Sequence, residues 1–229
     1  MPSLEWNRWW QRDFREFCES NPDKAYGVQW GDPELRGLRY LIQRLFHPSY
    51  GPGRLYKVVD KYIRPYVRAS STVLEIGPGG GRWTRYLVAA SKVICVDINP
   101  EFFGALRSMF PTANLEFYQP QGCDLRPVPD ESVDFAFSFG TFVHIEPEGI
   151  SEYLMEIHRV LRPGGIAVVQ YAEKKKPLAR DNPTFSYMTA DKMEAMAPMP
   201  IVAHNTRISK HSNIVVFKKE TDHTAHTTG

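Results

Sequence analysis

The chain of 229 residues has little cysteine and almost no net charge. Cys18, Cys95 and Cys123 are too few and too scattered for a disulfide framework or a zinc site, and they are typical of a reducing compartment. Lys plus Arg is 28 and Asp plus Glu is 26, so the formal charge is only +2. This balance gives no general attraction to nucleic acid, and we expect no nucleic-acid partner.

Long apolar runs are also missing. The longest, from Phe135 to Ile145, is interrupted by Ser138 and Gly140 and is too short to span a bilayer. The first residues read MPSLEWNRWWQRDF, with charges and tryptophans where a signal peptide needs a clean apolar stretch. We therefore expect a soluble, cytoplasmic protein with no membrane partner.

The composition and the hydrophobic pattern of the sequence divide the chain into three parts. Residues 1–66 are expected to be helical, because aromatic side chains recur at helical spacing and two further helical patterns, Glu34–Phe46 and one ending near Ile63, follow. Residues 67–220 alternate strand-like and helix-like runs and form the predicted core. Residues 221–229 are polar with no core-forming side chain, and we expect a disordered tail.

The core is predicted to be an α/β fold of the Rossmann-like type, with a mostly parallel sheet and an antiparallel hairpin at one edge. Alternating βαβ units impose the parallel arrangement. The predicted parallel strands are Thr72–Ile76, Lys92–Val96, Asn114–Tyr118, Val133–Phe139 and Ile166–Tyr171. Helices are expected over Arg82–Ala90, Pro100–Met109 and Glu148–Leu161, and the hairpin over Ile201–Ser209 and Asn213–Lys219.

A glycine-rich loop follows the first predicted strand. It reads VLEIGPGGGRWT, with Glu75 inside the strand and Gly77, Gly79 and Gly81 in the loop. Such a loop alone is weak evidence, because ordinary turns also need glycine. The next strand ends in Asp97, however, where a carboxylate can accept both hydroxyls of a ribose. Together they predict a nucleotide-containing cofactor.

From Thr72 to Tyr171 the chain resembles the class I S-adenosylmethionine-dependent methyltransferases. The resemblance is carried by the glycine loop, Asp97, the run PDESVD before the fourth strand and the turn LRPGG before the fifth. It implies a seven-stranded sheet behind an N-terminal helical lid. An NAD-binding enzyme is the nearest competitor, but the LRPGG turn and the acid inside the first strand argue against it.

This resemblance also implies which residues bind S-adenosylmethionine. Glu75, Gly77, Gly79 and Gly81 form the methionyl end, Asp97 holds the ribose, Ile98 packs on adenine, and Ser138 and Phe139 face the ammonium group. Many relatives have Gly-Asp after the third strand, whereas this chain reads QPQGCD there. Gln121, beside Gly122, can supply an amide oxygen to the adenine, or Asp124 can take that place; we favour Gln121.

Methyl transfer to an alcohol also requires a group that accepts the hydroxyl proton. His144, just beyond the fourth strand, is the predicted general base, and Glu146 or Glu148 can orient its ring. The competing interpretation is that His144 only caps a turn. A Mg²⁺ ion that clamps sugar hydroxyls needs only one or two carboxylates, so the metal dependence is left open.

The acceptor site is predicted from the segments that surround the cleft. Tyr26, Gln29 and Trp30 lie in a Gly/Pro-punctuated loop suited to closing over a ligand, and Tyr171 and Glu173 are expected to face the cleft mouth. The chain also resembles bacterial sugar O-methyltransferases, among them the mycobacterial type that acts on methylmannose oligosaccharides. We therefore expect a carbohydrate hydroxyl as the acceptor, with an amine, a phenol or a quinone carbon as the alternative.

Overall fold

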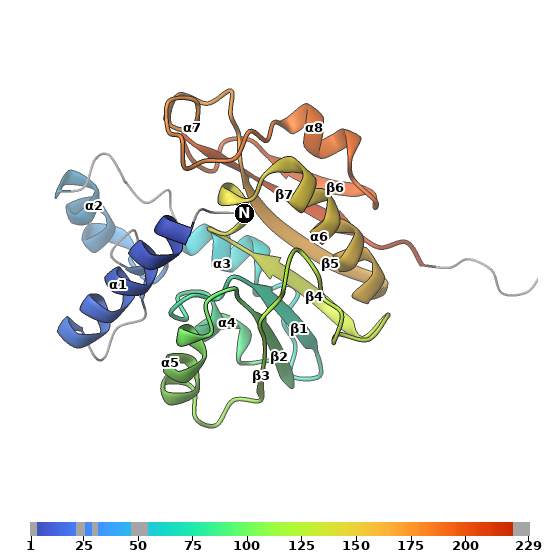
Figure 1. Ribbon diagram of the computed structural model, residues 1–229, viewed down its shortest axis with the longest axis horizontal. Helices are drawn as coiled ribbons and strands as arrows, with labels where there is room; N and C mark the ends of the chain where they lie inside the picture. Colours follow the sequence, from blue (N-terminus) through green and yellow to red (C-terminus); the bar gives the residue numbers. More distant parts are fainter. Residues whose placement is uncertain (1–3, 22–25, 29–31, 47–54, 222–229) are drawn as a thin grey trace, which may run out of the picture.

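The computed structural model describes residues 4–21, 26–28, 32–46 and 55–221. Within these ranges one sheet has the strand order β3-β2-β1-β4-β5-β7-β6 (Figure 1). The strands are β1 (Thr72–Ile76), β2 (Lys92–Val96), β3 (Leu115–Tyr118), β4 (Val133–Ser138), β5 (Leu161–Ala172), β6 (Ile201–Asn205) and β7 (Ser212–Lys218). Gln29, Trp30 and the predicted tail from residue 222 onward lie outside the described residues.

The sheet is parallel except at one strand. β1 pairs with β2 and β4, β2 with β3, and β4 with β5, all in parallel register, whereas β7 runs antiparallel to both β5 and β6. The predicted Rossmann-like sheet with its antiparallel edge hairpin is therefore confirmed. β6 ends four residues before the expected Ser209. The Ser209 hydroxyl instead accepts the backbone N–H groups of His211 and Ser212 and closes the turn.

Helices cover both faces of this sheet. Side chains of β1 alternate between them: Leu74 packs in the cluster that contains α6, and Val73 in the cluster that contains α3, α4 and α5. The helices are α1 (Leu4–Ser20), α2 (Gly37–Phe46), α3 (Tyr56–Tyr62), α4 (Thr84–Leu87), α5 (Glu101–Met109), α6 (Pro147–Val160), α7 (Pro177–Arg180) and α8 (Ala190–Ala195), with a 3-10 turn, η2, at Phe142–His144.

Two helices are shorter than predicted. α2 begins at Gly37 instead of Glu34, because Asp32 accepts the backbone N–H of Glu34 through its side chain and that of Leu35 through its carbonyl, which makes a turn there. α4 spans only four residues, since the turn after Gly81 takes up the first residues of the expected helix.

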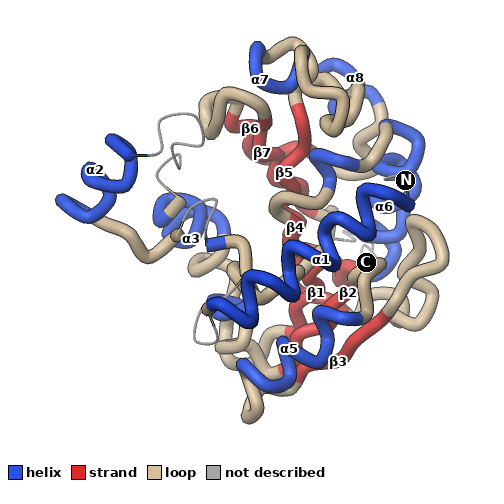
Figure 2. The backbone as a smooth tube through the Cα atoms, turned by 60° about the vertical axis from the view of Figure 1, so that its left-hand side comes forward, coloured by secondary structure: helices blue, strands red, loops and turns tan. Residues whose placement is uncertain are grey.

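Parallel strands bring the predicted functional residues to one edge of the sheet. The carboxyl ends of β1, β2 and β4 carry the glycine loop, Asp97 and Ser138. α1 also reaches this edge, where the Gln11 side-chain amide donates to Asn99 Oδ1 at 3.3 Å. α2 stands away from the sheet in both views of the molecule (Figures 1 and 2).

Candidate active site

The glycine loop between β1 and α4 has backbone geometry that favours glycine. Gly77, Gly79 and Gly81 have φ values of +74°, +49° and +87°, in the left-handed region where a Cβ atom is strained. The Gly77 N–H donates to the Val96 carbonyl at 2.7 Å, which ties the loop to the end of β2. A Cβ on Gly79 would meet no heavy atom within 4 Å, so open space lies beside this backbone. The loop can therefore be approached closely by a ligand.

Asp97 at the end of β2 is anchored to the same loop. Its Oδ2 accepts the Gly79 N–H at 3.2 Å, and its Oδ1 accepts the Asn99 N–H at 2.9 Å. Burial raises the pKa of Asp97 to about 6, against the lowering effect of these backbone donors, so the carboxylate is mostly ionised at neutral pH. The two oxygens have four lone pairs in all, so the carboxylate can still accept a ribose hydroxyl beside its backbone donors. Ile98, 36% exposed, offers an apolar side chain next to it.

The Glu75 side chain connects the two ends of the glycine loop. Its carboxyl is buried within β1 and accepts a hydrogen bond from the Thr84 hydroxyl, at the start of α4, at 2.7 Å. Burial raises its pKa to about 8, and the negative charge of Asp97 adds to this effect. Glu75 is therefore protonated at neutral pH and positions the loop between β1 and α4.

This burial predicts a pH-dependent stability that Glu75→Gln removes. The folded pKa of about 8 lies above the ordinary 4.5, so wild type takes up a proton on folding and loses stability as pH rises from 4.5 to 8. The expected loss is on the order of 5 kcal/mol. Thermal melts should show the Gln variant melting above wild type at pH 8, with the difference disappearing near pH 4. An equal difference at both pH values would contradict this assignment.

The end of β4 lies beside the glycine loop. The Ser138 hydroxyl donates to the Ile76 carbonyl at 2.8 Å, and the Phe139 ring packs on Trp83 with centroids 4.5 Å apart. The Thr141 hydroxyl donates a hydrogen bond to the Gly77 carbonyl oxygen at 3.5 Å. The loop after β4 is thus in direct contact with the glycine loop. That Ser138 and Phe139 face the ammonium group of a cofactor stays a prediction.

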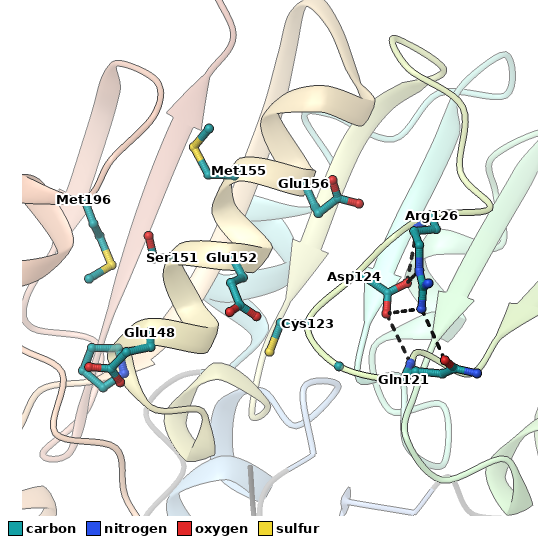
Figure 3. A pocket seen from close by; sticks show the side chains of 12 residues that line it. Gln121, Cys123, Asp124, Arg126, Glu148, Ser151, Glu152, Met155, Glu156 and Met196 are labelled. Atoms are coloured by element: carbon teal, nitrogen blue, oxygen red, sulfur yellow. Dashed lines mark hydrogen bonds and ion pairs between the residues drawn. The ribbon is translucent and has the colours of Figure 1, made fainter.

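Arg126 contacts both residues that are candidates for binding the adenine, Gln121 and Asp124, and the sequence patterns did not single it out. Burial opposes the shift, but hydrogen bonds from Arg126 and Tyr118 lower the pKa of Asp124 to about 2. Arg126 also donates to Gln121 Oε1 at 3.5 Å, so one guanidinium contacts both candidates (Figure 3). Gly122 accepts from the Tyr153 hydroxyl at 3.5 Å. The preference for Gln121 over Asp124 stays a prediction.

Beside these residues lies an open groove of about 1090 Å³ between the β3–β4 connection and α6 (Figure 3). Glu148 and Glu152 of α6 line it together with Asp124 and Arg126, and Figure 3 shows the Glu152 side chain between the helix and Cys123. Glu148 is thus a lining residue of this groove.

His144 is one 3-10 turn away from the glycine loop. Its backbone N–H donates to the carbonyl of Thr141, the residue that contacts Gly77. Its Nδ1 lies 2.8 Å from the Thr184 carbonyl. Because a carbonyl only accepts, Nδ1 carries the hydrogen and the lone pair of the neutral ring is on Nε2. Burial lowers the pKa of His144 below 6.5, so this basic form dominates at neutral pH.

The residue that orients this ring differs from the prediction. Thr184 lies in the segment between β5 and α8, far from Glu146 in sequence, and no motif marks it. Glu146 instead accepts the backbone N–H of Tyr187, and the Ser186 N–H donates to the Val143 carbonyl. These bonds hold the segment against η2.

An aromatic stack reinforces this contact. The Phe185 ring is stacked on the ring of His144, with centroids 5.6 Å apart. It is also stacked on the ring of His211, the residue before β7, with centroids 5.0 Å apart. Burial, the nearby Lys176 and His144 lower the pKa of His211 to about 4, so this ring stays neutral. Phe185 has no spacing pattern that could have identified it, because its segment is irregular.

Two predicted acceptor residues are in the wrong place for that role. Tyr171 is fully buried, and its hydroxyl is 2.7 Å from His204 Nε2 and accepts from Asn213. Glu173 is also buried and accepts the N–H of Ala190 and the side-chain amide of Asn213. The prediction that they face the cleft was wrong, because β5 continues to Ala172 and β7 covers this end of it.

Tyr26 packs directly on the glycine loop. It forms a parallel bridge with Gly81, and its ring contacts Phe14 of α1 and Phe102 of α5 edge-on and stacked, respectively. Its hydroxyl donates to Asp13 at 2.6 Å. The neighbouring Gly27 carbonyl accepts from Arg82 at 2.8 Å. Tyr26 and Gly27 thus lie against the glycine loop, while the lid role of residues 1–66 and contact of Tyr26 with an acceptor stay predictions.

Among the described residues, no group of three or more His, Cys, Asp or Glu side chains is placed to hold a metal ion. The same ranges contain no helix that is both long and apolar enough to cross a membrane.

A model of the family described as a methyltransferase domain matches residues 74–169, the stretch from β1 through most of β5. Over these residues the chain is similar to methyltransferase domains. The matched residues include the glycine loop, Asp97 and His144, and the class I fold of such domains agrees with the strand order.

Relatives and solved structures agree with this assignment. An uncharacterised methyltransferase-like protein of Schizosaccharomyces pombe is 31% identical over 120 residues, 52% of this chain and 43% of that protein. The ubiquinone/menaquinone biosynthesis C-methyltransferase of Hahella chejuensis is 31% identical over 57% of this chain and 54% of its own. The chain thus spans about half the length of the relatives it matches.

The similarity to solved structures concerns the fold. A SAM-dependent methyltransferase from Methanosarcina mazei superposes with a TM-score of 0.57 at 18% identity, covering 71% of this chain and 98% of that one. The PH0226 protein from Pyrococcus horikoshii gives a TM-score of 0.60 at 18% identity, with 88% and 99% covered.

Proposed function

We propose that this chain is an S-adenosylmethionine-dependent O-methyltransferase in which His144 is the general base. The observation that carries the proposal is the hydrogen bond from His144 Nδ1 to the Thr184 carbonyl, one turn from the glycine loop. A hydroxyl acceptor must lose its proton as it attacks, and the lone pair on Nε2 can take that proton. An amine attacks through a lone pair it already has and needs no such group.

The residues at the strand ends fit the cofactor. The open backbone at Gly79 and the ionised carboxylate of Asp97 would hold its methionyl and ribose parts, and Ile98 would pack on its adenine. When bound, the cofactor supplies an electrophilic methyl group on a sulfonium. His144 accepts the acceptor proton at Nε2, while Thr184 fixes the tautomer. Tyr26 and the segment that carries Phe185 flank the site and exclude water from it.

The narrower part of the proposal is that the hydroxyl belongs to a sugar or a short oligosaccharide, as in polysaccharide biosynthesis. It is supported by the resemblance of the sequence to bacterial sugar O-methyltransferases and by the polar and aromatic composition of residues 26–34. A carbon or sulfur acceptor is the alternative, since relatives include proteins named as a quinone C-methyltransferase and a thiol S-methyltransferase.

The test is the release of S-adenosylhomocysteine against a divided acceptor panel. One half holds free and partly methylated sugars and oligosaccharides; the other holds amines, phenols, thiols and quinone precursors. We expect turnover with the sugars, and each reaction is repeated with Mg²⁺ and with a chelator. Turnover confined to the second half would overturn the acceptor class, and turnover that does not depend on His144 would overturn the mechanism.

A further inference from the structure

The small net charge of the chain conceals a strong local excess of positive charge. Between residues 36 and 68 the sequence contains eight Lys or Arg residues and a single acid, Asp60, which makes this stretch +7 in a chain of +2. The rest of the chain is therefore −5. Such a separation of charge marks a surface for an anionic partner, which the whole-chain balance hides.

An exposed apolar stripe lies in the same stretch. Leu38, Leu41, Ile42 and Leu45 of α2 recur at helical spacing and are 71%, 52%, 46% and 78% exposed. α2 stands away from the sheet in both views (Figures 1 and 2). Four large apolar side chains on one helix face, left in water, are unfavourable unless another surface covers them.

Basic side chains are exposed on both α2 and α3. Arg36, at the start of α2, makes paired hydrogen bonds of 3.1 and 3.2 Å to Asp60 of α3, and Asp60 also binds Arg64. These bonds connect the residue that precedes α2 with α3. Arg39 on α2 is exposed, as are Lys57 and Lys61 on α3, whose apolar residues Val58 and Val59 face the core.

We propose that α2 and the exposed side of α3 form a peripheral binding surface for anionic lipid bilayers. A helix with leucines on one face and arginines beside them lies at a bilayer surface, with the apolar face among the acyl chains and the charges at the headgroups. Nucleic acid would also match the charge, but its phosphates are bound by basic side chains and its unpaired bases by aromatic ones, so a stripe of exposed leucines has no part in such a surface. The expectation of no membrane partner considered only spanning segments and total charge.

The test uses the full-length protein and sedimentation with vesicles. We expect it to bind vesicles that contain phosphatidylglycerol, to bind phosphatidylcholine vesicles weakly, and to dissociate as salt is raised. Leu38→Ser combined with Leu45→Ser should lower the partition coefficient ~10-fold or more. Arg39→Gln should lower it ~5-fold. The matched controls are Leu178→Ser with Val202→Ser, both exposed apolar residues elsewhere, and Arg12→Gln on α1, each expected to change binding less than twofold.

Circular dichroism melts verify that each variant is folded. Failure of wild type to bind anionic vesicles overturns the proposal, and so does an equal loss of binding in the controls. It is also overturned if wild type is a dimer that the double leucine variant converts to a monomer without any change in vesicle binding, because α2 would then bind a second copy. Methyl transfer to soluble acceptors is measured separately and should be unchanged in all these variants.

Discussion

His144→Ala is expected to lower kcat by ~10²–10⁴ while leaving the affinity for S-adenosylhomocysteine unchanged. The imidazole is held by Thr184 so that Nε2 is the proton acceptor, and alanine removes the only group proposed for that step. The backbone of η2 does not depend on the side chain, since its hydrogen bond to Thr141 is made by the main chain. The measurements are steady-state turnover and calorimetric binding of the product.

The pH profile separates a base from a merely structural histidine. Burial lowers the pKa of His144 below 6.5. Wild-type kcat/KM should therefore fall as the pH drops through the pKa of His144 and Nε2 is protonated, which gives the profile an acid limb. The variant should lack this limb. His158→Ala, on α6, is the control and should retain both turnover and limb. Unchanged turnover in His144→Ala would end the base role, and a stability loss without a kinetic one would support the turn-capping interpretation.

The part of the fold that could be predicted is the part in which local pattern and tertiary contact agree. The β1 and β2 ranges match the prediction residue for residue, because buried parallel strands read as continuous apolar runs bounded by turns. Glu75 was placed inside the first of those strands and Asp97 at the end of the second, and the topology then brings them to one edge. Their contacts differ, however. Asp97 accepts the backbone N–H of Gly79 in the glycine loop, whereas the buried carboxyl of Glu75 accepts the hydroxyl of Thr84.

The residues that were missed act across long sequence separations. Thr184 and Phe185 contact His144 from 40 and 41 positions away, in a segment with no periodicity, and only the hydrogen bonds of the folded chain place them there. Tyr171 was misplaced for the same reason. A residue at the end of a strand faces a cleft only if nothing covers it, and β7 returns from the far end of the chain to cover it.

The substitution Gly77→Ala is expected to abolish measurable binding of S-adenosylhomocysteine. A Cβ on Gly77 would lie 1.7 Å from the Thr141 hydroxyl oxygen and 2.7 Å from its Cβ, and the φ of +74° adds backbone strain of about 1–2 kcal/mol. The glycine loop and the turn that leads to His144 must then separate. Gly104→Ala is the matched control, because its Cβ would meet nothing within 4 Å in the middle of α5 and should stabilise the helix by ~0.5–1 kcal/mol.

A double variant distinguishes the clash from the backbone strain. Thr141→Gly removes the three side-chain atoms that a Cβ on Gly77 would meet, so combining it with Gly77→Ala should restore part of the binding measured by calorimetry. The strain of the positive φ remains, and recovery should therefore be incomplete. Full binding by Gly77→Ala alone would show that the loop and η2 are not in contact in solution. No recovery in the double variant would assign the whole effect to the backbone, and the approach of Thr141 to Gly77 would then have no part in shaping the site.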